Sequence, residues 1–145
     1  MVHPNTGEIF IVSKEASGIS GVYTFPMPLQ PNLRVTLQKI ATLTFTSSLL
    51  SGRLAKAETM TTGGDISPDG RRLVIRTYLR AYEWAIALRQ TVADALKGKP
   101  RIFFLPLTKQ GEGICYRADG KTFLTTSEGE NSPLYEIPGD NTSPK

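Results

Sequence analysis

Three short runs rich in Val, Ile, Phe, Leu and Thr occur along the chain, and each follows a turn that ends in glycine. Runs of such residues bounded by turn signals predict β-strands. In each copy a polar turn and a second short strand with a tyrosine come next. The copies span residues 5–26, 69–85 and 119–138. Their turn glycines, at positions 7, 70 and 120, stand 63 and then 50 residues apart, a spacing that suits one four-stranded sheet per copy with insertions.

The segments between the copies supply the remaining strands. Residues 35–45 alternate for long enough to form an outer strand, after an extended crossing that contains three prolines. Residues 62–67 and 110–116 predict the innermost strands of the second and third sheets. The apolar run 101–107 predicts the outer strand of the second sheet.

Helical character is weak and local. Leu88, Val92 and Leu96 have helical spacing, which predicts a short helical insertion within residues 86–97. Residues 47–61 lack strong β character and indicate a connection that contains, at most, a helical turn.

The strand count is then three, four and three, with the inner strand missing from the first sheet and the outer strand missing from the last. Repeated sheets of this size predict an all-β fold made of about two and a half to three β-propeller blades over residues 1–138. A flexible tail is expected over 139–145. Because a propeller closes with about four to eight blades, the ring has to be completed by the rest of a longer chain or by self-association. Two copies would make six blades with twofold symmetry.

Composition narrows the classes of function. The net charge is +4, from 17 Lys and Arg against 13 Asp and Glu, and the basic residues are scattered, which argues against nucleic acid as a partner. There is no run of about 20 apolar residues and no signal peptide at the start, so we expect a soluble chain without a membrane partner. A mildly cationic surface favours a small anionic ligand. The single cysteine excludes an internal disulfide.

The third copy contains the most specific sequence motif. Residues 110–136 contain Glu-Gly-Ile, an Asp-Gly turn, and a strand that ends in Ser-Glu-Gly followed by Asn and Ser. This segment resembles the phytase-like and esterase-like β-propellers, and residues 6–15 look like another blade of that type. Residues 66–70, Ile-Ser-Pro-Asp-Gly, resemble the turn of TolB-like and WD40-like repeats.

The resemblance implies a fold and a range of activities. Phytase-like propellers hold calcium with carboxylates at the central channel, and basic side chains help to bind phosphate; related propellers are often exported. Only Glu112 matches that blade motif at a channel position. The first hypothesis is therefore a binding or scaffold module with an unidentified ligand. The alternative is a calcium-dependent, phytase-like phosphoesterase, and the sequence leaves open whether the chain is an enzyme and in which compartment it works.

Two carboxylates are the candidate metal ligands. Glu112 lies between two glycines on a predicted innermost strand, and Asp65 lies on another. Carboxylate oxygens there suit a hard cation such as calcium. The plain structural alternative for Glu112 is a hydrogen bond to backbone amides of a neighbouring blade.

Three basic residues are the candidate ligands for an anion: Lys14, Arg76 and Arg117. Arg76 lies within an apolar strand, where a half-buried guanidinium needs a partner. An inter-blade salt bridge is the simplest expectation for it.

Other polar residues have structural explanations. Asp69 and Asp119 precede turn glycines, and that position accounts for both. His3 is the only histidine, so a Ser-His-Asp triad or a histidine zinc site within one chain is not expected. Cys115 is expected to pack on a buried strand. Glu128 and Glu130 are expected at a solvated hairpin tip.

Overall fold

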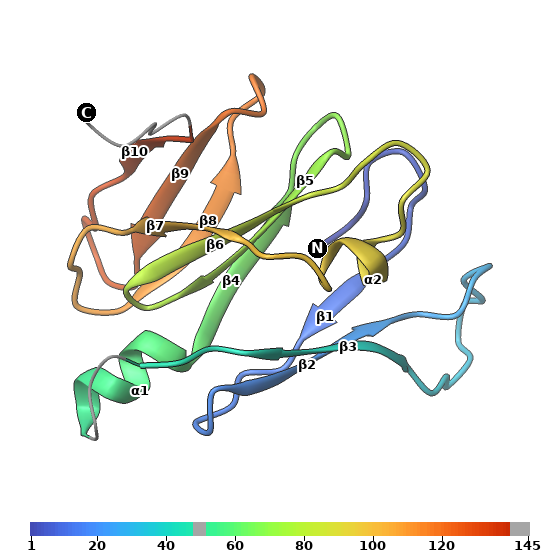
Figure 1. Cartoon of the computed structure of the whole chain (residues 1–145), viewed down its shortest axis with the longest axis horizontal. Helices are drawn as coiled ribbons and strands as arrows, with labels where there is room; N and C mark the ends of the chain where they lie inside the picture. Colours follow the sequence, from blue (N-terminus) through green and yellow to red (C-terminus); the bar gives the residue numbers. More distant parts are fainter. Residues whose placement is uncertain (48–51, 140–145) are drawn as a thin grey trace.

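The computed structural model describes residues 1–47 and 52–139 as three antiparallel sheets, here called blades 1, 2 and 3 (Figure 1). The strands of blade 1 are β1 (Phe10–Val12), β2 (Ile19–Thr24) and β3 (Gln38–Thr44). Those of blade 2 are β4 (Thr61–Ile66), β5 (Arg72–Thr77), β6 (Arg80–Ala85) and β7 (Arg101–Phe104). Blade 3 contains β8 (Gly111–Tyr116), β9 (Thr122–Ser127) and β10 (Tyr135–Pro138). The predicted all-β fold of partial propeller blades is confirmed.

Two short helices interrupt the strands. Helix α1 (Arg53–Thr59) leads into β4, and α2 (Val92–Ala95) lies between β6 and β7. The segment 48–51, inside the predicted connection, and the predicted tail from residue 140 onward lie outside the described residues.

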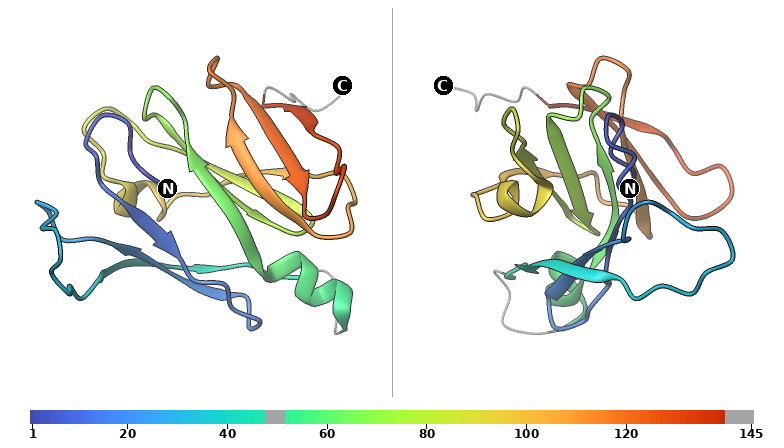
Figure 2. Two further views of the ribbon diagram at one scale, coloured as in Figure 1. Left: turned by 180° about the vertical axis from the view of Figure 1, so that it is seen from behind. Right: turned by 90° about the vertical axis from the view of Figure 1, so that its right-hand side faces the viewer.

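Apolar side chains pack between consecutive blades. Figure 2 shows β4 running between β1 and β8, so that blade 2 lies in the middle. Between blades 1 and 2 the core contains Phe10, Val22, Leu73, Ile75 and Trp84. Between blades 2 and 3 it contains Val74, Phe103, Ile114, Tyr116 and Phe123. Alternate residues of β5 thus pack against opposite neighbours, as face-to-face sheets require.

The turn glycines that revealed the repeat share one backbone conformation. Gly7, Gly70 and Gly120 have φ values of 72°, 70° and 63°, a left-handed region that glycine enters without steric cost. In the second copy, Asp69 Oδ1 accepts from the Arg71 backbone N–H at 2.9 Å. Asp119 Oδ1 does the same for Lys121 at 2.8 Å. Their predicted role in the turns is confirmed.

The first blade keeps a short piece of its inner strand. The Met1 ammonium donates to the Phe10 carbonyl at 2.9 Å, and the Phe10 N–H donates back to Met1 at 2.8 Å. Val2 also forms a bridge with Ile9. Residues 1–3 therefore pair with one end of β1 only.

One predicted boundary was wrong. Strand β3 begins at Gln38 and not at 35, because β2 ends at Thr24, opposite Gln38, and leaves the preceding residues without a partner. The predicted short helical insertion within 86–97 is confirmed as α2, which covers four of those residues. Arg89 has a φ of 66°, which is incompatible with a helix, and the helix starts only after Thr91, whose side chain accepts from the Asp94 N–H.

The prediction that Cys115 is buried was also wrong: it is exposed. Its neighbours Ile114 and Tyr116 face blade 2, so strand alternation turns Cys115 to the opposite face. None of the described helices is long and apolar enough to cross a membrane.

Candidate functional site

The inner strands β4 and β8 carry the same irregularity one repeat apart. The pairing register shifts between Thr61 and Gly63 in β4, and between Gly111 and Gly113 in β8. Thr62 and Glu112 are thus the extra residues of two β-bulges. A bulge re-aims a side chain out of the regular alternation. The bulge therefore sets the direction of the Glu112 side chain near the start of β8.

The two bulges lie against each other. Thr62 Oγ1 donates to the Gly111 carbonyl at 3.0 Å. A Cβ atom on Gly63 would collide with the carbonyl oxygen of Glu112. Glycine at position 63 therefore allows the inner strands of blades 2 and 3 to approach closely at this end.

Glu112 forms a cluster with residues from both other blades. Lys14 lies just beyond the end of β1. Its Nζ donates to Glu112 Oε1 at 3.0 Å and to Tyr78 Oη at 2.8 Å. The Tyr78 hydroxyl, in the turn between β5 and β6, donates to the same Glu112 oxygen at 3.0 Å. Gln110 Nε2 also approaches it, at 3.4 Å. We call Lys14, Tyr78, Gln110 and Glu112 the mouth cluster; it joins three blades at one point.

The hydrogen bonds of the mouth cluster favour the charged forms of Lys14 and Glu112. Its hydrogen bond to Tyr78 raises the pKa of Lys14, an effect that burial opposes and that Glu112 reinforces. Burial alone would raise the pKa of Glu112, but the hydrogen bonds from Lys14, Tyr78 and Gln110 outweigh it and lower the pKa. Both groups are ionised at neutral pH. The side chains remain accessible, with 40% of Lys14 and 27% of Glu112 exposed.

Arg76 lies behind the mouth cluster and is 1% exposed. Its guanidinium donates to the carbonyls of Thr77, Gly113 and Tyr78 at 3.0, 2.9 and 3.2 Å, and to the Thr125 hydroxyl. Among the described residues no carboxylate lies within ion-pair distance of it. Burial lowers its pKa to about 10, so it stays charged at neutral pH. The expected inter-blade contact exists, but with neutral oxygens of blade 3 and not with a carboxylate.

The other predicted site residues lie elsewhere. Asp65 Oδ2 accepts from the Tyr116 backbone N–H at 2.9 Å, at the opposite end of β4 and β8 from Glu112. Arg117 forms an exposed ion pair with Glu136 at 2.6 Å. The structure thus brings together Lys14, Arg76 and Glu112, and separates Asp65 and Arg117 from them.

Sequence reasoning missed Tyr78 and Gln110. Tyr78 is half-buried in the turn between β5 and β6, and as the last residue of a β-rich run it offered no signal of a site. Gln110 immediately precedes β8, two residues before Glu112. Neither position indicates which residues of the other blades it contacts.

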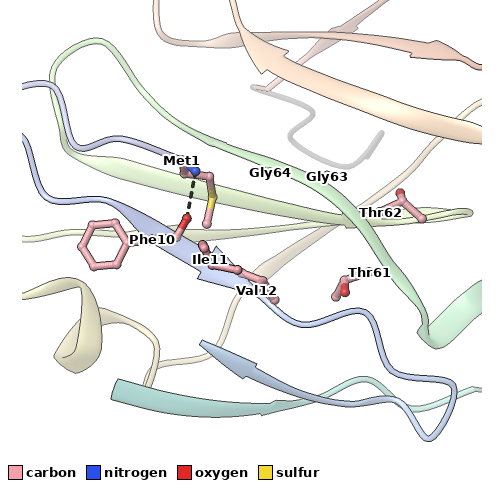
Figure 3. Close-up of a pocket in the computed structure, with 8 residues that line it drawn as sticks. All are labelled: Met1, Phe10, Ile11, Val12, Thr61, Thr62, Gly63 and Gly64. Carbon is pink, nitrogen blue, oxygen red and sulfur yellow. Dashed lines mark hydrogen bonds between the residues drawn. The ribbon is translucent and has the colours of Figure 1, made fainter. Parts of the chain in front are cut away.

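A cavity of about 260 Å³ opens between β1 and β4 (Figure 3). It is lined by Met1, Phe10–Val12 and Thr61–Gly64. Thr61 Oγ1 donates to the Ser13 carbonyl at 2.8 Å, next to Lys14. Only Ser13 separates Val12, which lines the cavity, from Lys14 of the mouth cluster. On the other side, Thr62 lines the cavity and donates to the carbonyl of Gly111, the neighbour of Glu112. The cavity and the mouth cluster are therefore adjacent.

In the described part of the chain, no group of three or more His, Cys, Asp or Glu side chains is arranged to hold a metal ion. Glu128 and Glu130 are exposed near the β9–β10 hairpin tip.

Comparison with known proteins supports the architecture. No family model matches the sequence, and the search of curated proteins finds no significant relative. Among solved structures, the chain is similar to a putative 6-phosphogluconolactonase from Bacteroides uniformis ATCC 8492, with a TM-score of 0.51 and 15% identity. The match covers 96% of this chain and 40% of that one. At this identity the likeness shows the fold alone, and this chain spans less than half the length of that structure.

Proposed function

We propose that the chain is a β-propeller binding module that holds a small anionic ligand at the mouth cluster. The observation that supports this most is the charge balance around Glu112. Lys14 and Arg76 are both positive, and Glu112 is the one carboxylate bonded within the group. One positive charge is left over, partly shielded from water, where the attraction for an anion is stronger than in bulk solvent.

The ligand's anionic group would contact the exposed Lys14 ammonium, while Arg76 contributes through its field and not by contact. The body of the ligand would extend toward the cavity between β1 and β4, whose threonines offer hydroxyl groups. A phosphorylated sugar acid has this combination of an anionic end and a hydroxyl-rich body. The name of the similar structure suggests such a compound as a probe. The end sheets would be covered within a larger assembly, by a second copy or by the rest of a longer chain.

Binding should depend on Lys14. Replacing Lys14 with Met removes the only exposed cation of the mouth cluster, so we expect 6-phosphogluconate to bind at least ~10-fold more weakly, since a hydrogen bond to a charged group contributes about 1.5–3 kcal/mol. Isothermal titration calorimetry measures this directly. The matched control is Lys97→Met: Lys97 is an exposed lysine paired with Asp94 at 2.6 Å and belongs to another part of the fold. Equal affinity for the wild type and both variants would refute the proposal.

The calcium-dependent phosphoesterase is the second candidate, and it rests on the two inner-strand carboxylates, Glu112 and Asp65. The geometry supports it less well. Glu112 already accepts from an ammonium, a hydroxyl and an amide, and Asp65 is bonded at the other end of the strands. Calcium prefers six to eight oxygen ligands.

A calcium titration distinguishes the two candidates. The binding module is expected to gain neither thermal stability nor phosphatase activity toward p-nitrophenyl phosphate when calcium is raised to the millimolar range. A gain in both, abolished by Glu112→Gln, would overturn the binding-module proposal in favour of the metal-dependent enzyme.

A further inference from the structure

A second cavity lies between the outer strands of blades 1 and 2. It has a volume of about 330 Å³ and is lined by residues 42–46 of blade 1 and, among others, by Tyr82, Trp84 and Ile102 of blade 2. We call it the outer groove. It shares no lining residue with the mouth cluster or with the cavity between β1 and β4, so a ligand here would be separate from the proposed anion.

The backbone of β3, the edge strand of its sheet, points into the outer groove. The Phe45 N–H donates to the Gly18 carbonyl, on the β2 side, at 2.9 Å. Because residues of an antiparallel strand bond their two neighbours alternately, the N–H and C=O groups of Thr42 and Thr44 face the open side. Among the described residues, neither group has a backbone partner there. Leu43 and Phe45 are buried toward blade 2, so the threonine side chains point away from it, and the threonines line the groove with backbone.

Strand β7 adds an apolar wall that blade 1 leaves uncovered. The rings of Phe45 in β3 and Tyr82 in β6 have centroids 4.8 Å apart, so β3 lies over β6. Ile102 is opposite Tyr82 in the β6–β7 register, and Phe104 points to the same side. They are 53% and 77% exposed. Since neighbouring strands are about 4.7–4.9 Å apart in any sheet, one more strand beside β3 would lie over β7 and cover this wall.

The rim of the outer groove carries an unpaired positive charge. Lys99, in the α2–β7 loop, is exposed, and the residues on either side of it line the groove. Lys97 and Arg101 each have a carboxylate partner, and so does Arg80, which lines the groove and is paired with Glu58. Lys99 forms no ion pair within the part of the chain that the structure describes. An acidic side chain on the ligand would complement it.

We propose that the outer groove binds an extended peptide that adds a strand to β3, with apolar side chains at alternate positions and an acidic residue at one end. The peptide backbone would pair with the open groups of Thr42 and Thr44, its apolar side chains would cover β7, and its carboxylate would meet Lys99. Strand addition to a sheet edge draws affinity from the backbone bonds and specificity from contacts with alternate side chains. An apolar small molecule would cover the wall but leave the edge groups unpaired.

The probe is the peptide acetyl-Val-Thr-Val-Thr-Val-Asp-amide, whose valines share one face of a strand. Trp84 is the only tryptophan of the chain and lines the groove, so its fluorescence reports binding. We expect a saturable change. The same peptide with its three central backbone nitrogens methylated keeps the side chains but loses donors, and it is expected to bind at least ~10-fold more weakly.

Two pairs of variants test the edge and the wall. Thr44→Pro removes the open N–H, which an edge strand tolerates, and is expected to weaken binding at least ~10-fold because the proline has no donor and its ring takes up space. Thr44→Val keeps the N–H and should bind as the wild type does. Ile102→Asp puts a charge on the wall and should weaken binding by at least ~10-fold, whereas Leu134→Asp, at a 65% exposed position of blade 3, should not. Circular dichroism checks that each variant is folded.

Three outcomes would overturn the proposal. One is the absence of any saturable change in Trp84 fluorescence. Another is equal affinity for the two peptides, or for Thr44→Pro and Thr44→Val, because side chains would then bind without strand pairing. The third is a wild type that dimerises in light scattering coupled to size-exclusion chromatography and becomes monomeric with Thr44→Pro, since the edge would then serve a second copy of the chain.

Discussion

Replacing Arg76 with Met is expected to lower the free energy of unfolding by about 3 kcal/mol. Methionine has a similar length, so the change leaves little empty space. It does, however, remove a donor for the carbonyls of Thr77 and Tyr78, and one of two donors for the Gly113 carbonyl, which keeps the Thr125 hydroxyl at 2.7 Å. Each buried acceptor left without a partner costs about 1–3 kcal/mol, and removal of the buried charge returns part of that cost.

Urea denaturation monitored by tryptophan fluorescence measures the effect. Arg117→Met is the matched control, since its ion pair with Glu136 is exposed and such pairs contribute about 0–1 kcal/mol. If Arg76→Met were as stable as the wild type, Arg76 would not be joining blades 2 and 3.

Gly63→Ala is expected to destabilise the protein by about 1–3 kcal/mol, the usual range for overpacking. The new methyl group would meet the Glu112 carbonyl and lie close to the Arg76 side chain. Because backbone cannot move aside as a flexible side chain can, β4 and β8 have to separate. The separation would also displace Glu112 from Lys14, so we expect weaker binding of 6-phosphogluconate together with the loss of stability.

The control is Gly98→Ala, where the new Cβ has only one close neighbour, the Ala95 carbonyl at 3.2 Å. Thermal unfolding and calorimetric titration of the two variants give both quantities. A Gly63→Ala variant with normal stability and normal affinity would show that the inner strands are not closely opposed at this point.

Local features of the sequence predicted the blades well. The turn glycines and the aspartates before them fix short stretches of backbone, so their positions could be found without knowing the fold. The spacing of Leu88, Val92 and Leu96 located the short helix within 86–97 but not its start, because Leu88 is 71% exposed and belongs to a turn. Spacing alone did not distinguish a turn followed by a short helix from one longer helix.

The mouth cluster could be predicted only in part. Glu112, Lys14 and Arg76 were found as separate candidates, from their residue types and their places on strands. Their meeting could not be predicted, since Lys14 and Glu112 are 98 residues apart and come together through a bulge and the packing of three blades. Asp65 was linked to Glu112 because both lie on inner strands, but they lie toward opposite ends of the paired strands.

The most direct test of the account is an NMR titration of the ¹⁵N-labelled chain with 6-phosphogluconate. The backbone amide signals of Lys14, Tyr78 and Glu112, one from each blade, are expected to shift together with a single dissociation constant, while those of Asp65 and Arg117 at the far end of the inner strands stay in place. Shifts confined to the far end, or the absence of any saturable shift at the mouth cluster, would contradict the proposed binding site.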